Sequence, residues 1–347
     1  CAMLLRLMIA LVFSTTAARA FQAQFAPATA LRSTSSSTFM RMASSLTGKT
    51  CVSVEESLDA HGSSSTKFVD GSWFLKGRDG REEFEAGPRI EGAEYFDIND
   101  ISAKGADLNP KGLPHMMPPK QLFAAAMDAM GISNEDHIVL YGGKGCLTTH
   151  RAWFQIRSMG HDVDRLHLLQ GNLGDWIDLG GPIEEGAKVA VKSADFDLSK
   201  PTNYQASDPR NVVDINEVLK IIEEGESSDS VIVDVRAKER YLGQVEEPRP
   251  NMRLGHMPGA LNMPFADLLD PDDVTKFKPV EELQKLIKEA GIDITTEKRL
   301  VISCGSGATA CALVAALEVC GRDPSDNFVY DGSWSEWGGQ DDTPIVK

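Results

Sequence analysis

The strongest constraint on the fold is an internal duplication, in which the same motifs recur in the same order about 160 residues apart. An apolar, strand-like run enters a glycine-rich loop at 137–145 and again at 299–307. An apolar helical stretch follows each loop and stops at a glycine, Gly160 in the first half and Gly321 in the second, as helix C-termini often do. Several kinds of match in one order predict two domains of the same fold.

Strand-like runs alternate with amphipathic helical stretches in both halves, and the helical stretches at 121–130 and 281–290 correspond. This alternation predicts an α/β fold with two tandem domains, each a parallel sheet with helices on both faces. We expect the domains at 55–185 and 208–347. Between them, 186–207 mixes charge, Ser, Pro and Asn without a helical period, which is typical of a linker.

The first 54 residues contain basic residues but no acidic one, and we expect 1–54 to be a targeting presequence outside the fold. An apolar run at 3–13 is followed by a small-residue cleavage pattern at 18–20 and then by sequence rich in Ser, Thr and Arg. This order is typical of the bipartite presequences that lead into secondary plastids, so a plastid location is expected. A mitochondrial presequence and a simple secretory signal are the alternatives.

The charge and the cysteines exclude several classes of function. The chain has 35 basic and 51 acidic residues, a formal charge of -16, which argues against binding to nucleic acid or to an anionic membrane surface. Its six cysteines form no CxxC pair and have no metal-ligand spacing with the seven histidines. We therefore expect no metal site and no disulfide framework, and free thiols in a reducing compartment.

One cysteine stands where a parallel sheet places its ligands. Cys304 follows a predicted strand, and Gly305, Ser306 and Gly307 allow the backbone to curve so that successive N–H groups face one anion. The N-terminus of the next helix adds its positive end, so the loop should favour a thiolate or a persulfide anion. Cys146 in the first half does not compete, because it lies four residues beyond the aligned position.

A cysteine loop on such a sheet is also found in phosphatases, where an arginine six residues after the cysteine grips phosphate. Ala310 occupies that position, and no arginine follows until Arg322. The loop therefore lacks the bidentate anion clamp that phosphatase and arsenate reductase chemistry requires.

The residues of the second half resemble those of the tandem-rhodanese sulfurtransferase family, and within it the 3-mercaptopyruvate sulfurtransferase branch. The stretch from Cys304 to Thr309 is similar to the uncharged CGSGxT loop of that branch, whereas the thiosulfate-preferring branch has basic residues in this loop. The resemblance covers nearly everything after residue 65 and includes further motifs at Val69–Trp73, Leu113–Pro118, Val233–Arg236, Gly255–Ala260 and Tyr330–Trp334.

The resemblance implies a role for each matching residue. Cys304 would be the nucleophile, with the hydroxyls of Ser306 and Thr309 facing the substrate or the developing charge. The other members of the implied site are two substrate-binding arginines, two loop glycines and a histidine reaching in from the first domain: Arg240, Arg249, Gly305, Gly307 and His115.

One position departs from the family pattern. The family places an acidic residue, partner of the histidine, two positions after the aspartate of its Phe-Asp motif, and this chain has Asn99 there. We expect the neighbouring Asp100 to take over as the catalytic acid through a local shift, unless the acidic partner is dispensable.

The activity implied is transfer of sulfur from 3-mercaptopyruvate, with thiosulfate as an optional second donor, through a Cys304 persulfide to a thiol acceptor or cyanide, with release of pyruvate. This activity requires no metal or organic cofactor, so we expect none. The partners implied are a small anionic donor and thioredoxin or a small thiol as acceptor, without nucleic acid, and the mature chain is expected to be a monomer that is not membrane-bound. The alternatives are a thiosulfate-preferring enzyme, a persulfide carrier loaded by a desulfurase, and a structural rhodanese-like module without chemistry.

Overall fold

The computed structural model describes residues 46–347, and most of the predicted presequence lies outside them. The first sheet is entirely parallel, with strand order β1-β6-β5-β2-β4. Its elements are β1 (Cys51–Val52), α2 (Val54–Ala60), β2 (Thr66–Asp70), α3 (Gly80–Ala86), β4 (Glu94–Tyr95), α4 (Lys120–Ala129), β5 (His137–Gly142), α5 (Thr149–Ser158), β6 (Leu166–Asn172) and α6 (Leu173–Asp178). A separate antiparallel pair joins β3 (Arg89–Ile90) to β7 (Ile183–Glu184).

The second sheet is also entirely parallel and has the order β10-β9-β11-β12-β8, which matches the first sheet strand for strand when read from its other edge. Its elements are β8 (Val212–Val213), α7 (Ile215–Glu224), β9 (Ser230–Asp234), α8 (Lys238–Tyr241), β10 (Leu261–Asn262), α9 (Val280–Glu289), β11 (Arg299–Ser303), α10 (Ala310–Val319), β12 (Asn327–Tyr330) and α11 (Ser333–Trp337). Short 3-10 helices lie at Val163–Arg165, Ser193–Asp195, Gly225–Ser227, Phe265–Leu268 and Pro324–Asp326. The prediction of two tandem α/β domains is confirmed.

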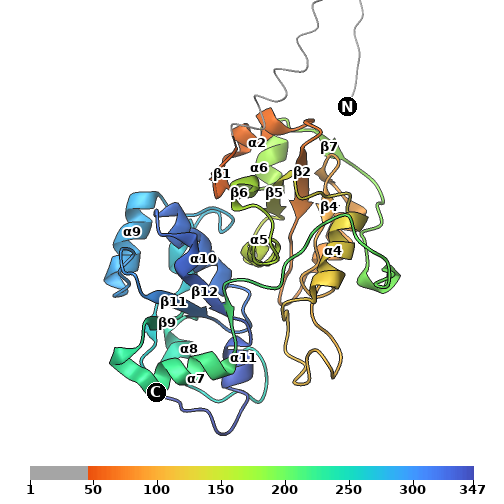
Figure 1. The fold of residues 1–347 in the computed structure, drawn as a ribbon. Coiled ribbons are helices and arrows are strands. Elements are labelled where there is room, and N and C mark those ends of the chain that lie inside the picture. Colours follow the sequence, from red (N-terminus) through yellow and green to blue (C-terminus); the bar gives the residue numbers. More distant parts are fainter. Residues whose placement is uncertain (1–45) are drawn as a thin grey trace, which may run out of the picture.

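Helices cover both faces of each sheet, as the alternating pattern predicts. Figure 1 shows the two sheets as separate lobes with α5 and α10 between them. These two helices belong to one continuous apolar core that runs from the first sheet into the second, whereas α6 and α11 pack in separate cores on the outer faces. Nearly every side chain of α5 and α10 is buried, so the domains form one closely packed body.

The first domain begins before residue 55, contrary to the expected boundary. Strand β1 pairs with β6 at the edge of the sheet, and Leu46 is fully buried. Ser53 closes a capping box with Glu56 at the start of α2, which satisfies the free N–H groups of that helix. A strand of two residues carries too little periodicity to be recognised next to the basic, Ser-rich sequence before it.

The segment between the domains is not a free linker, since it packs along the first domain. Tyr204 is almost fully buried against His161 and Phe123. Within the described residues 46–347, no helix is both long and apolar enough to cross a bilayer.

Candidate active site

Cys304 lies directly after β11, at the carboxyl end of the central strand of the second sheet. The strand is buried between β9 and β12, and the thiol residue itself is only 1% exposed. It opens into a cavity of about 260 Å³ between the domains. The first domain contributes Trp73, Phe74, Leu147 and Thr148 to the walls of this cavity, so each domain supplies part of the site.

The loop after Cys304 is held by its carbonyl groups. The Cys304 carbonyl accepts from Trp334 N at 3.0 Å, and the Gly305 carbonyl accepts from Ser335 N at 2.9 Å and Ser335 Oγ at 2.6 Å. In a trans peptide the C=O and the following N–H point in opposite directions, so these bonds to α11 turn the N–H groups of Gly305 and Ser306 the other way.

The N–H groups of the loop are available to an anion. Among the described residues, none of the backbone N–H groups from Gly305 to Thr309 has a hydrogen-bond acceptor. Gly305, Ser306, Ala308 and Thr309 all line the cavity beside Cys304, and α10 begins immediately afterwards. Unpaired N–H groups at the start of a helix favour a bound anion, here a thiolate, a persulfide or a substrate carboxylate.

Both predicted substrate arginines lie over this loop. A Cβ placed on Gly305 would lie 3.1 Å from Arg240 Nη2 and 3.9 Å from Arg249 Nη1, which shows how closely the two guanidinium groups approach. Arg240 is held by a bidentate ion pair with Glu247. The Oε1 atom of Glu247 also accepts from Nη1 of the buried Arg236.

Arg249 differs from Arg240 because it has no ion pair or hydrogen bond within the part of the chain that the structure describes. Burial lowers the pKa of Arg249 and the charge of Arg240 lowers it further, while Cys304 and Glu247 act in the opposite direction. An anion entering the cavity would relieve this uncompensated positive charge, so Arg249 has the character of a binding group.

Gly307 shows why one position of the loop must be a glycine. Its φ of +75° lies in the left-handed region, and an added Cβ would lie 2.9 Å from Asp331 O and 3.2 Å from Arg151 Nη1. Its carbonyl accepts from Arg151 Nη1 at 3.3 Å. The loop is therefore packed tightly against a residue of the first domain.

His115 comes from the first domain, as expected, but it lines a neighbouring cavity rather than the Cys304 cavity. It is 3% exposed, it packs edge-on against Trp73 with ring centroids 4.6 Å apart, and neither ring nitrogen has a hydrogen-bond partner among the described residues. Burial, with the nearby charges of Arg151 and Arg249, lowers the pKa of His115 to about 3. The imidazole is therefore neutral at physiological pH.

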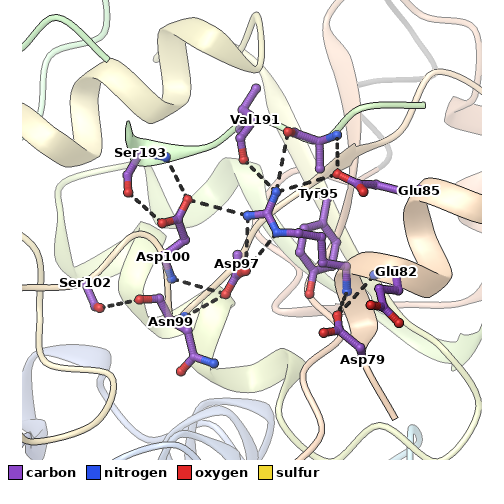
Figure 2. Close-up of polar contacts among 12 residues, drawn as sticks. Asp79, Glu82, Glu85, Tyr95, Asp97, Asn99, Asp100, Ser102, Val191 and Ser193 are labelled. Carbon is purple, nitrogen blue, oxygen red and sulfur yellow. Dashed lines mark hydrogen bonds and ion pairs between the residues drawn. The ribbon is translucent and has the colours of Figure 1, made fainter. Parts of the chain in front are cut away.

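Asp100 does not pair with His115, and the expected shift of the acid is not seen. Figure 2 shows the Asp100 carboxylate turned toward Ser193 of the inter-domain segment, where it accepts from the backbone N at 2.7 Å and from Oγ at 2.6 Å. Ion pairs with Lys104 at 3.1 Å and Arg81 at 3.5 Å complete its surroundings. The carboxylate is drawn away because this cluster offers several donors. Its neighbour Asn99 lines the same cavity as His115.

Two residues of the site escaped the sequence analysis, Arg151 and Asp331. The Arg151 guanidinium is fully buried and donates to the carbonyls of His115 and Gly307 and to Asp331 Oδ1, the last at 2.7 Å. All ten residues of α5 are buried, polar ones included, so no periodicity marks which of them face the site. Asp331 stands in a motif noted from the sequence, but nothing in the motif indicates its partner.

The loop of the first domain that corresponds to the Cys304 loop has no room for a nucleophile. A Cβ on Gly142 would lie 2.5 Å from Thr149 Oγ1 and 3.0 Å from the Cβ of Cys146, so these side chains fill the equivalent space. The described residues contain no group of three or more His, Cys, Asp or Glu side chains that could hold a metal ion. The polar groups that line the Cys304 cavity include its thiol, the loop N–H groups, the guanidinium groups of Arg240 and Arg249, and Ser306 and Thr309.

Comparison with known proteins agrees with this geometry. The family model of the rhodanese-like domain matches residues 214–340. The 3-mercaptopyruvate sulfurtransferase of Mus musculus is 36% identical over 289 residues, which cover 82% of this chain and 89% of that one. The mitochondrial thiosulfate/3-mercaptopyruvate sulfurtransferase 1 of Arabidopsis thaliana is 33% identical over 294 residues, covering 80% and 73%.

A solved structure shows the same architecture. The crystal structure of the 3-mercaptopyruvate sulfotransferase SseA from Escherichia coli superimposes with a TM-score of 0.66 and 27% sequence identity, and the match covers 82% of this chain and 99% of that one. The chain therefore belongs to the family of two-domain rhodanese enzymes known as thiosulfate/3-mercaptopyruvate sulfurtransferases, and it transfers sulfur.

Proposed function

We propose that the sulfur donor is 3-mercaptopyruvate and that Cys304 carries the sulfur as a persulfide. The observation that carries this proposal is the pair of guanidinium groups over an N–H-lined cavity, with Arg249 unpaired among the described residues. A 2-oxo carboxylate presents two adjacent anionic or polar oxygens that suit a planar fork. The uncharged Gly305 and Ser306 favour this donor over thiosulfate.

In the proposed reaction the Cys304 thiolate attacks the sulfur of mercaptopyruvate. The new S–S bond forms as the S–C bond breaks, and the electron pair of that bond leaves on the pyruvate enolate, which then takes up a proton at carbon. Arg240 and Arg249 hold the carboxylate and carbonyl, and the hydroxyls of Ser306 and Thr309 stabilise the developing charge. His115 is neutral because of its burial and lines the neighbouring cavity, so the proposed reaction gives it no direct contact with the sulfur.

The second half-reaction passes the outer sulfur to a thiol. We propose thioredoxin or a small thiol as the acceptor, with cyanide as a substitute in vitro; Phe74, Leu75 and Pro248 line the same cavity as Cys304 and give it an apolar wall beside the arginines. The acceptor thiolate would attack the outer sulfur, and the Cys304 thiolate would leave. Both domains of one chain line the cavity, which supports catalysis by a monomer.

The experiment that tests Cys304 is mass spectrometry after incubation with the donor. The Cys304 peptide should gain one sulfur, about 32 Da, and return to its original mass when reduced thioredoxin is added. Sulfur on the Cys146 peptide instead, or full turnover by Cys304→Ser, would refute the assignment. Values of kcat/KM for mercaptopyruvate and thiosulfate, measured side by side, decide between the two donors.

A persulfide carrier loaded by a desulfurase is the second candidate, and the arginines discriminate against it. A carrier that never binds a small carboxylate would keep its activity when Arg240 and Arg249 are replaced. An enzyme that uses mercaptopyruvate would lose it.

We further propose that the chain works in an organelle. The sequence before residue 46 favours a plastid, and the named mitochondrial relative keeps the mitochondrion as the alternative. Localisation of the full chain with a C-terminal fluorescent tag, compared with the chain lacking residues 1–45, tests this. Unchanged location of the shortened chain would contradict a targeting role for the presequence.

A further inference from the structure

A buried arginine of the first domain contacts the active loop of the second. Arg151 is completely buried on α5, and it donates to the carbonyls of Gly307 and His115 and to the carboxylate of Asp331. The same carboxylate accepts from Met117 N at 2.8 Å, two residues beyond His115. One ion pair therefore fastens three segments: the cysteine loop, the turn that carries His115, and the end of β12.

The hydrogen bond from Arg151 to the Gly307 carbonyl also fixes the orientation of the next N–H group, that of Ala308. Because Arg151 holds the Gly307 carbonyl, the N–H of Ala308 on the other side of the same peptide is turned away from Arg151, and Ala308 lines the cavity beside Cys304. The carbonyls of Cys304 and Gly305 are held by α11 of the same domain, whereas this third carbonyl is held from the other domain.

The bond to His115 fixes a strained turn. His115 has a φ of +59°, which is uncommon for a residue with a side chain. Its carbonyl is held by Arg151, and the chain beyond it is held by Asp331. Without these bonds the turn would lose the contacts that offset the cost of its conformation.

The surroundings of Arg151 stabilise its positive charge. Burial by itself would lower the pKa of Arg151, but the carboxylate of Asp331 and the Cys311 thiol raise it above its usual value. Arg151 thus keeps its charge without any water contact. Such a buried charge is costly unless it is fully paired, which argues that the position serves more than packing.

We propose that Arg151 is a positioning residue for sulfur transfer: from the domain that has no nucleophile, it orients the Ala308 N–H toward the Cys304 sulfur and fixes the His115 turn. This inference rests on the proposed role of Cys304. It assigns the first domain a part in setting the reactivity of the thiol, beyond supplying walls of the cavity.

The test uses Arg151→Lys in the full chain, with Arg157→Lys as the matched control. Both arginines are buried on α5, and Arg157 pairs across the domain interface with Glu318, away from the cysteine loop. A lysine keeps the charge near Asp331 but cannot reach both carbonyls as a fork does.

The readout is the rate at which iodoacetamide alkylates the Cys304 peptide, followed by mass spectrometry as a function of pH. Losing one N–H bond to the thiolate should move the midpoint of this profile up by about one pH unit, a tenfold change in the thiolate fraction, with kcat at least tenfold lower. The control should lower the melting temperature without moving the midpoint. The charged or titratable groups nearest to Cys304 are Arg240, Arg249 and Cys311, and the Arg151–Asp331 pair contacts the loop through Gly307. Arg151→Lys keeps a positive charge opposite Asp331, so a moved midpoint reports the lost fork of hydrogen bonds rather than a lost charge.

An unmoved midpoint and unchanged kcat in Arg151→Lys would overturn the proposal, as would an equal shift in the control. Arg151→Gln combined with Asp331→Asn removes both buried charges together, leaves no unpaired ion, and should give the same upward shift. Failure of the proposed function looks different, because the wild-type Cys304 peptide would then gain no sulfur from the donor.

Discussion

The structure predicts that the two substrate arginines are unequal, and that Arg249 carries more of the binding energy than Arg240. Glu247 already neutralises Arg240 through a bidentate pair, whereas Arg249 has no charged partner within the described residues. Replacing Arg249 by Met removes a positive charge that no carboxylate of the described residues neutralises, so substrate binding should weaken strongly. Replacing Arg240 by Met removes a positive charge that Glu247 already neutralises, so substrate binding should weaken less.

The expected loss of kcat/KM for each variant follows from the hydrogen bonds that its arginine can make to the substrate. A hydrogen bond to a charged group is worth about 1.5–3 kcal/mol, and two such bonds from Arg249 to the substrate, discounted for its partly exposed position, correspond to about 3 kcal/mol. That is about a hundredfold loss in kcat/KM at about 1.4 kcal/mol per factor of ten. For Arg240 the loss should be about 1.5 kcal/mol, or about tenfold. Arg249→Lys, which keeps the charge without the fork, should fall between them.

The assay is steady-state release of pyruvate from 3-mercaptopyruvate, coupled to lactate dehydrogenase, with thermal unfolding of each variant as the control for folding. The Cys304 alkylation rate at fixed pH shows whether the thiol is intact. The reasoning fails if Arg240→Met costs as much as Arg249→Met or more, because the pairing with Glu247 would then not reduce the role of Arg240.

Three further predictions concern single positions. Gly307→Ala should lower kcat more than tenfold, since its Cβ would press on Asp331 O and Arg151; activity within twofold of wild type would refute the tight packing. Asp100→Ala should lower the free energy of unfolding by about 1–2 kcal/mol through lost bonds to Ser193 while kcat stays within twofold, and a tenfold fall in kcat would restore a catalytic role. Burial lowers the pKa of His150 to about 4, so the unfolded state binds a proton below about pH 6.5 while the folded state does not; stability is lost as the pH falls. His150→Met should therefore make the loss of unfolding free energy between pH 7.5 and pH 5 smaller by about 2 kcal/mol in urea titrations, and an identical pH dependence would contradict the burial argument.

Much of the fold could be predicted because its signals are local. The helices at 120–129 and 280–289 and the strands at 137–142 and 299–303 lie where periodicity placed them, since an amphipathic helix or buried strand is encoded within about ten residues. The two-residue strand β1 was missed, because its stability comes from pairing with β6 and not from its own sequence.

The sequence by itself determined that Cys304 ends a buried strand, that a glycine loop and a helix follow it, and that the first domain has Gly142 at the equivalent position. Only the tertiary structure decided which distant groups meet there. Arg151 and Gly307 are 156 residues apart in the chain, and their contact depends on how α5 and α10 pack between the domains. The position of Asp100 also depends on the tertiary structure. Folding brings Ser193 close to it, and the two hydrogen bonds from Ser193 hold its carboxylate; a sequence alone does not show which donors will lie nearest to a carboxylate.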